Sequence, residues 1–193
     1  MSSSNSILST LAGILLKALG RESRSTPVRP DRPDAQLRET SARGGSAAGE
    51  EPGRNRGSET VRVDPDRIRD LTVSYAPQRD GAPDAGEVIW TWVPYEENDG
   101  RGKDRPVLVI GRQSADRVYA VRMTSKPHDG DRDFLSIGTG GWDSQGRESW
   151  VDIEQLYSVH DRGMRREAAV LDAGRYERVA SALVTRYGWA RKR

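Results

Sequence analysis

The chain of 193 residues is long enough for one domain or two small ones. It has no cysteine and only two histidines, far apart in sequence, which excludes disulfides, thiolate metal sites and histidine-rich metal sites. The net charge of +2 is unevenly placed, because residues 83–193 hold 18 Lys and Arg against 18 Asp and Glu. A nucleic-acid site in that region would therefore need a local basic patch.

Residues 6–20 predict a short apolar helix that ends at Gly20. The segment lacks the basic start of a signal peptide and is too short to span a bilayer, so we expect no stable membrane insertion. The segment docks on a membrane surface or a partner, packs on its own domain, or is a poorly ordered terminus.

Residues 21–60 are rich in Arg, Ser, Pro, Gly and Glu and hold almost no large apolar side chain. Such a segment cannot bury enough surface to offset its ordering entropy, which indicates a disordered linker. Residues 61–82 are more apolar and predict a short helix or an extended arm laid on the domain. The predicted organisation is thus a helix over 1–20, a linker or arm over 21–82, and a domain over 83–193.

From residue 84 onward the pattern changes to strands. Apolar alternation or short apolar runs predict strands over 86–95, 105–111, 117–125, 134–138 and 149–153, with a last short strand at 170–171. Strands at this spacing, with Gly and Asp turns, suggest a small antiparallel barrel. A helix follows, with Asp172 as its N-cap, an apolar stripe from Tyr176 to Tyr187, and Gly188 as its stop.

Three pieces occur in a fixed order: GEVIW at residues 86–90, KDRPVLVI at 103–110, and YAVRMTS at 119–125. An Arg-Pro pair opens the second piece, and Thr-Ser closes the third. Over residues 84–189 this order resembles the MazF/PemK family of toxin endoribonucleases. Three motifs in the right order are far more specific than the Arg-Pro strand alone.

The resemblance implies a mainly β fold, a small SH3-like antiparallel β-barrel with a C-terminal helix, as in MazF/PemK toxins and gyrase poisons. It implies the toxin of a type II toxin–antitoxin system, cleaving single-stranded RNA at specific sequences without a metal or other cofactor. It further implies a homodimer, a cognate antitoxin protein as partner, and a cytoplasmic location.

The resemblance places catalytic residues at Arg105, Thr124 and Glu154. Metal-free RNA cleavage turns the 2′-hydroxyl onto phosphorus, and it needs proton-transfer groups and donors for the charge on the phosphoryl oxygens. Arginine offers a fixed cationic fork for that phosphate, and a Thr hydroxyl adds one hydrogen bond. The alternative for Arg105 is a surface ion pair with Asp104 or a glutamate, and for Glu154 an exposed strand carboxylate. Where some members carry an arginine two residues before the acid, this chain has Asp152.

The RNA-binding candidates are Arg101, Lys103, Ser125 and Trp142. Arg101 and Lys103 lie in the loop that gates the RNA groove in the family, where they could meet phosphates. Trp142 lies in a Gly-rich loop and could stack on an unpaired base, or it could pack against the nearby Trp150.

Other assignments stay open at the level of sequence. His128 is either a general base or a solvated loop histidine. The domain could bind nucleic acid or protein without cutting, since fold alone does not fix function. It could also poison DNA gyrase, a role that would not need Arg105 and Thr124.

Overall fold

The computed structural model describes residues 53–192 other than 79, 81 and 98, and only the backbone of 166–168. The predicted helix over 6–20 and the predicted linker before residue 53 lie outside the described residues. The elements are β1 (Val61–Val63), η1 (Pro65–Arg67), β2 (Thr72–Val73), β3 (Glu87–Pro94), β4 (Gly102–Arg112), β5 (Arg117–Thr124), β6 (Phe134–Gly138), β7 (Ser149–His160), η2 (Asp161–Gly163), β8 (Met164–Val170), α1 (Ala173–Tyr187) and β9 (Ala190–Arg191).

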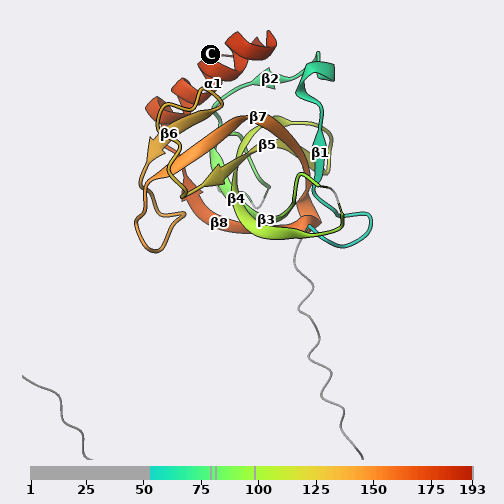
Figure 1. Cartoon of the computed structure of the whole chain (residues 1–193). Helices are drawn as coiled ribbons and strands as arrows, with labels where there is room; N and C mark the ends of the chain where they lie inside the picture. The colour runs from blue at the N-terminus through green and yellow to red at the C-terminus, as the bar shows by residue number, and fades with distance from the viewer. Residues whose placement is uncertain (1–52, 79, 81, 98, 193) are drawn as a thin grey trace, which may run out of the picture. The chain divides into compact units, whose positions relative to one another are not determined.

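The main sheet is antiparallel and runs in the order β1-β7-β5-β4-β3-β8, with β6 paired to the first part of β7. It curls strongly, so that β3, β4, β5, β7 and β8 surround a common interior in Figure 1. In the described part of the chain no strand pairing joins β1 to β8, so a seam remains between the two ends of the sheet. The prediction of a mainly β domain with a C-terminal helix is confirmed.

Period-two alternation sends the apolar side chains of the strands to two separate clusters. One cluster fills the interior of the curl: Ile89, Val93, Val107, Val109, Val118, Ala120, Tyr157 and Val159. The other lies between the outer face of the sheet and α1, and its members include Val88, Leu108, Ile110, Val121, Leu156 and Leu183. The sequence from Pro106 to Ile110 is continuously apolar because β4 is covered on both faces, and its alternate side chains enter the two clusters.

The helix begins and ends where the sequence predicts. The side chain of Asp172 accepts a hydrogen bond from the Arg175 backbone N–H, and Gly188 closes the helix in a left-handed conformation with φ of 69°. Tyr176, Val179 and Leu183 are buried against the sheet. Their spacing of three and four residues explains why one face of α1 is apolar.

Three strands are longer than predicted, and the one predicted over 105–111 is observed as Gly102–Arg112 because its first residues pair with β3. The strand predicted over 149–153 continues to His160, because β7 borders β5 along its length and pairs with β1 over Leu156–Ser158. Its polar residues are hydrogen-bonded there: Ser158 Oγ, for instance, lies 2.5 Å from the Gln113 side chain. The short strand predicted at 170–171 is the end of β8, an edge strand whose charged sequence lacks the apolar alternation used for prediction.

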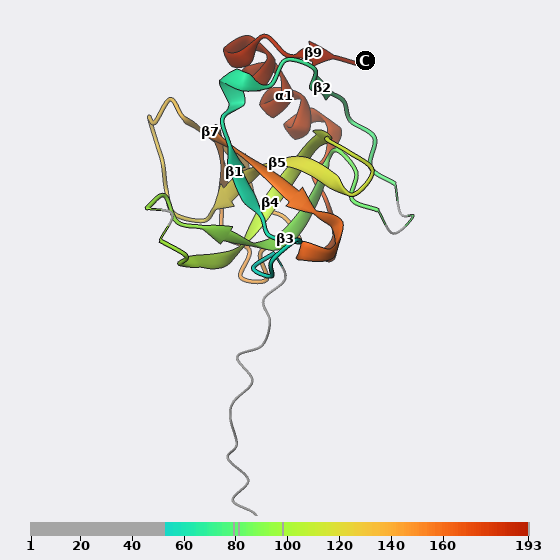
Figure 2. The same cartoon turned by 90° about the vertical axis from the view of Figure 1, so that its right-hand side faces the viewer.

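The described residues between 61 and 82 form an extended arm with a single 3-10 turn, one of the two expected alternatives. β2 pairs in parallel with β9 beside α1, as Figure 2 shows. Leu71 and Val73 belong to the cluster under α1, and the Trp189 indole N–H donates to the Ile68 carbonyl at 3.0 Å. The division of the chain at residue 83 stays a prediction. No helix among the described residues is long and apolar enough to cross a membrane.

Candidate functional site

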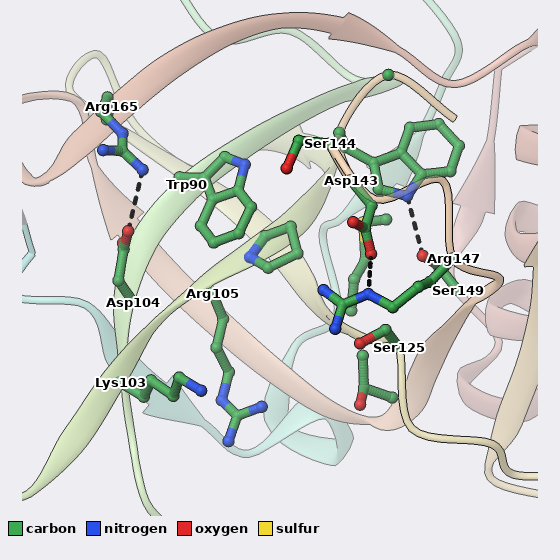
Figure 3. Close-up of a pocket in the computed structure, with 15 residues that line it drawn as sticks. Trp90, Lys103, Asp104, Arg105, Ser125, Asp143, Ser144, Arg147, Ser149 and Arg165 are labelled. Carbon is green, nitrogen blue, oxygen red and sulfur yellow. Dashed lines mark hydrogen bonds and ion pairs between the residues drawn. The ribbon is translucent and has the colours of Figure 1, made fainter. Parts of the chain in front are cut away.

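A pocket of about 390 Å³ opens where β4 and β5 meet the loop over residues 139–148. Five residues that the sequence analysis singled out line it: Lys103, Arg105, Thr124, Ser125 and Trp142. Figure 3 shows that Lys103 and Arg105 extend from the same stretch of β4. The structure thus brings together most of the predicted site.

The register of β4 against β5 explains how Arg105 and Thr124 come to share this pocket. Val107 pairs with Arg122 in an antiparallel ladder. Counting two residues outward along both strands sets Arg105 and Thr124 opposite each other, just beyond the last paired residues of β4 and β5. Arg105 lies within β4, paired with Thr91 of β3 and directly before the apolar run of that strand, and Thr124 is the last residue of β5. Strand pairing therefore holds the backbone of both residues in place.

Arg105 does not form the ion pair that was the alternative to a functional role. Its neighbour Asp104 instead accepts from the Arg165 guanidinium on β8, with 3.1 Å between Oδ2 and Nη2. Among the described residues Arg105 has no carboxylate within ion-pair distance. Its guanidinium is therefore available to an anion that enters the pocket.

Thr124 also keeps a donor for a ligand. Its Oγ1 accepts a hydrogen bond from the Lys126 backbone N–H at 3.1 Å. Because this contact uses only an acceptor lone pair, the hydroxyl hydrogen remains able to donate. The backbone contact also fixes the position of the hydroxyl at the end of β5.

The residues that the structure adds to the pocket include two ring and guanidinium partners, Trp90 and Arg165, and an ion pair, Asp143 and Arg147. The Arg165 guanidinium lies over the Trp90 ring, 5.7 Å from its centroid. Arg147 Nε donates to Asp143 Oδ2 at 2.8 Å, and this hydrogen bond holds the pKa of Asp143 below its usual range. The Trp90–Arg165 pair is set by the β3–β8 register, which the sequence does not reveal, since it contains a bulge.

Trp142 lines the pocket as a buried residue, with only 5% of its surface exposed. Its indole N–H donates to Ser149 Oγ at 3.0 Å, and its ring belongs to the cluster that includes α1. Trp142 therefore anchors the 139–148 loop to the domain. It packs in the core without the exposed face that stacking on a base requires.

Glu154 and Arg101 do not line the pocket. The Glu154 carboxylate is 4.0 Å from the Arg186 guanidinium of α1, because β7 carries it past β6 toward the helix. Arg101 is held within its own loop by Asp99, with 2.6 Å between Nε and Oδ2. His128 is likewise outside the pocket, and its ring stacks on Phe134.

Asp152, where some members of the family have an arginine, takes part in a buried ion pair with the neighbouring strand. Its Oδ2 is 2.6 Å from the Arg122 Nη2, and its Oδ1 accepts from the Glu154 and Gln155 backbone N–H groups. In this chain the paired arginine and acid therefore lie on two neighbouring strands, Arg122 on β5 and Asp152 on β7, and not on one strand. This pair lies outside the pocket and ties β5 to β7.

The pocket is locally basic although its domain is formally neutral. Four cationic side chains line it, those of Lys103, Arg105, Arg147 and Arg165, against the two carboxylates of Asp104 and Asp143. Such an excess of positive charge attracts phosphates. It forms the local basic patch that a nucleic-acid site in this formally neutral domain would need. Among the described residues no group of three or more His, Asp or Glu side chains is placed to hold a metal ion.

A family model described as "PemK-like, MazF-like toxin of type II toxin-antitoxin system" matches residues 84–185. No curated protein matches the sequence significantly. Among solved structures, MazF (Form-I) from Deinococcus radiodurans is similar at 20% identity, over 55% of this chain and 97% of that chain, with a TM-score of 0.44. An endoribonuclease in complex with its cognate antitoxin, from Mycobacterial species, is similar at 17% identity over 55% and 96%, with a TM-score of 0.43.

Proposed function

Because the chain belongs to the PemK-like, MazF-like toxins of type II toxin–antitoxin systems, we propose that it is an endoribonuclease that cleaves single-stranded RNA. The observation that carries this proposal is the unpaired guanidinium of Arg105 in a basic pocket, beside the hydroxyl of Thr124. A phosphodiester is the ligand that such a group of donors fits.

Attack of the 2′-oxygen forms its bond to phosphorus and breaks the bond from phosphorus to the 5′-oxygen, which gives a 2′,3′-cyclic phosphate and a 5′-hydroxyl. The 2′-hydroxyl gives its proton to water, the leaving 5′-oxygen takes one from water, and negative charge develops on the phosphoryl oxygens between the two transfers. Donors held in place before the reaction stabilise that charge with little reorganisation. In the proposed mechanism the Arg105 fork binds two phosphoryl oxygens, and Thr124 donates to one of them. No metal ion is needed for this stabilisation, so the proposed reaction is metal-independent.

The rest of the pocket positions the RNA. Lys103 and Ser125 line the pocket near Arg105 and Thr124, and they would hold the sugar–phosphate chain on either side of the cleaved bond. Trp90 is half-buried and presents an aromatic surface for a base. Asp104 accepts from the guanidinium of Arg165, and Asp143 accepts from that of Arg147. In the proposed mechanism each carboxylate positions its arginine for RNA binding.

The family also supports proposals on partners. Type II systems pair a toxin with an antitoxin protein, and the similar Mycobacterial endoribonuclease is in complex with its cognate antitoxin. We therefore propose a cognate antitoxin for this chain, a homodimeric state, and action in the cytoplasm, where messenger RNA is the substrate.

The test is cleavage of a long single-stranded RNA by the full chain in EDTA, with both product ends mapped. The proposal expects cuts within a short sequence motif, 5′-hydroxyl ends, and 2′,3′-cyclic phosphate ends. A 2′-O-methylated RNA of the same sequence should stay intact, because its nucleophile is blocked. Binding without cleavage, with or without added metal, or products with 5′-phosphate ends would contradict the proposal.

A further inference from the structure

A second groove, of about 660 Å³, lies between β1 and the C-terminal half of β3. It is lined by every residue of the segment 59–65 and by Trp92, Pro94, Tyr95, Glu96 and Gly100. It shares no residue with the basic pocket. One wall precedes residue 84, where the match to the family model begins, so the match does not cover that wall.

The groove coincides with the seam in the curled sheet. β1 is a terminal strand whose one edge pairs with β7. β3 pairs with β8 only up to Thr91, which leaves the outer edge of Trp92–Pro94 without a strand partner in the described part of the chain. The opposite edges are taken by β7 and β4, so both unpaired edges border the groove.

One end of the groove is closed. Thr60 Oγ1 and Thr91 Oγ1 are 2.7 Å apart, and the Thr91 hydroxyl donates to the Gly163 carbonyl at 2.8 Å. Beyond this pair the two strands separate toward Val63 on one side and Tyr95 on the other, with the groove between them. The result is a wedge with backbone donors and acceptors along its sides.

Apolar side chains are exposed along the wedge. Val61 is 42% exposed and Tyr95 is 36% exposed, two of the four large apolar side chains that are exposed among the described residues. Trp92 lies under the wedge, with the Arg54 guanidinium 5.8 Å from its ring centroid. An occupant with apolar side chains would cover this surface.

The charged side chains that line the groove are mainly acidic: Glu59, Asp64 and Glu96 against Arg62. Asp64 already pairs with Arg67 and Glu96 accepts from Gln155, but Glu59 Oε2 is covered and accepts no hydrogen bond. The backbone N–H of Glu59 holds the pKa of its carboxyl below the usual range, so the group is ionised at neutral pH.

We propose that this groove binds an extended segment of a partner protein as an added strand, in which apolar side chains alternate with arginine or lysine. Backbone hydrogen bonds to the two unpaired edges would supply affinity, and side chains at alternate positions would supply specificity. The acidic lining disfavours a nucleic acid, whose phosphates it would repel. It also disfavours a second copy of β1, because symmetric pairing would bring like charges together.

The probe is an acetylated and amidated peptide of sequence Ser-Ile-Arg-Phe-Arg-Ile-Ser, which does not repeat the sequence of β1, titrated into the full chain by calorimetry. Two matched peptides serve as controls. One has glutamate in place of both arginines, and the other is N-methylated at alternate peptide bonds so that it cannot complete a strand ladder. The proposal expects saturable binding of the first peptide, with affinity at least about tenfold weaker for each control.

Val61→Asp tests the groove itself, and Val170→Asp on β8 is its control, because Val170 is similarly exposed at 39%. Val61→Asp should weaken peptide binding about tenfold or more, since it places a charge against apolar side chains, and Val170→Asp should leave the affinity unchanged. Glu59→Gln should weaken the arginine peptide without affecting folding, and melting curves of all three variants establish that they fold.

Several results would overturn the proposal. They are absence of peptide binding up to about 1 mM, equal binding of the N-methylated peptide, or equal loss in both valine variants. A dimer that Val61→Asp dissociates would assign the groove to a second copy. Displacement of the peptide by a short single-stranded RNA would assign it to the nucleic acid.

Discussion

Asp104 pairs with Arg165 across the sheet, at 3.1 Å, and not with Arg105, its neighbour in sequence. Adjacent residues of a strand point to opposite faces, so the pairing follows from the pleat of β4. β8 brings Arg165 to the face that Asp104 occupies, where Arg165 also covers Trp90. This arrangement leaves the charge of Arg105 uncompensated and gives the pocket its positive potential.

Removing Arg165 should reduce RNA cleavage through Asp104. In Arg165→Ala the Asp104 carboxylate loses a partner next to Arg105, and we expect single-turnover cleavage to fall by about tenfold. Asp104→Asn in the same chain removes the carboxylate charge next to Arg105 and should restore the rate to within about threefold of the parent. Rates of the four proteins in this double-mutant cycle measure the coupling, and strictly additive effects would show that Asp104 does not act on Arg105.

Trp90 and Trp142 should respond differently to substitution. Trp90→Ala removes a half-buried ring and should weaken binding of a short single-stranded RNA by about 1–3 kcal/mol, the range for one stacked base. Trp142→Phe removes the donor to Ser149 and should lower the free energy of unfolding by about 1 kcal/mol with little effect on RNA affinity. Fluorescence anisotropy and denaturant titrations separate the two effects, and the reverse pattern would mean that Trp142 stacks on RNA.

The arm before residue 84 should be part of the folded domain. Leu71 is 2% exposed and lies in the cluster under α1, so Leu71→Ala should lower the free energy of unfolding by about 2–5 kcal/mol. Thr72→Ala, at the adjacent exposed position, is the control and should change stability by less than about 0.5 kcal/mol. Equal unfolding free energies for Leu71→Ala and the parent would show that the arm does not contribute to the core.

Tyr176 should make the domain sensitive to alkali. Its hydroxyl donates to the carbonyls of Ser74 and Ile110, and burial raises the pKa of the phenol. A raised pKa in the folded state means that this contribution to stability is complete below about pH 10 and is lost as the pH rises further. Tyr176→Phe should cost about 1–2 kcal/mol at pH 8 and show a shallower loss above pH 10. Parallel slopes for the two proteins would contradict this assignment.

The parts of the fold that local patterns specify could be predicted from the sequence. The helix from Asp172 to Gly188 carries its cap, stripe and stop within one segment. The strand over 134–138 was predicted at its observed bounds. Arg105 and Thr124 were found through motifs that lie within β4 and at the end of β5, and the structure places both in one pocket.

What could not be predicted depends on pairing between distant segments. The ends of β7 and β8 are set by neighbours far away in sequence and by bulges in the ladder. The contribution of Arg165 to the pocket comes from the β3–β8 register, and the burial of Trp142 comes from its contact with Ser149 and the core. The spacing of residues along the sequence gives no information on these contacts between distant segments.

The account depends most directly on Arg105. We expect Arg105→Ala to cleave single-stranded RNA about 100-fold or more slowly than the parent, the scale of losing one transition-state donor. Its unfolding free energy should shift by no more than about 1 kcal/mol, because the side chain is only half-buried and has no carboxylate partner among the described residues. Arg105→Lys should restore little of the rate, since an ammonium lacks the two-pronged contact.

Single-turnover cleavage rates and circular dichroism melts together test whether Arg105 acts in catalysis. Arg178→Ala, on the exposed face of α1, is the control. The account predicts that Arg105→Ala folds like the parent and loses cleavage, while Arg178→Ala retains both. An Arg105→Ala protein that unfolds, or that folds and cuts at the parental rate, would contradict it.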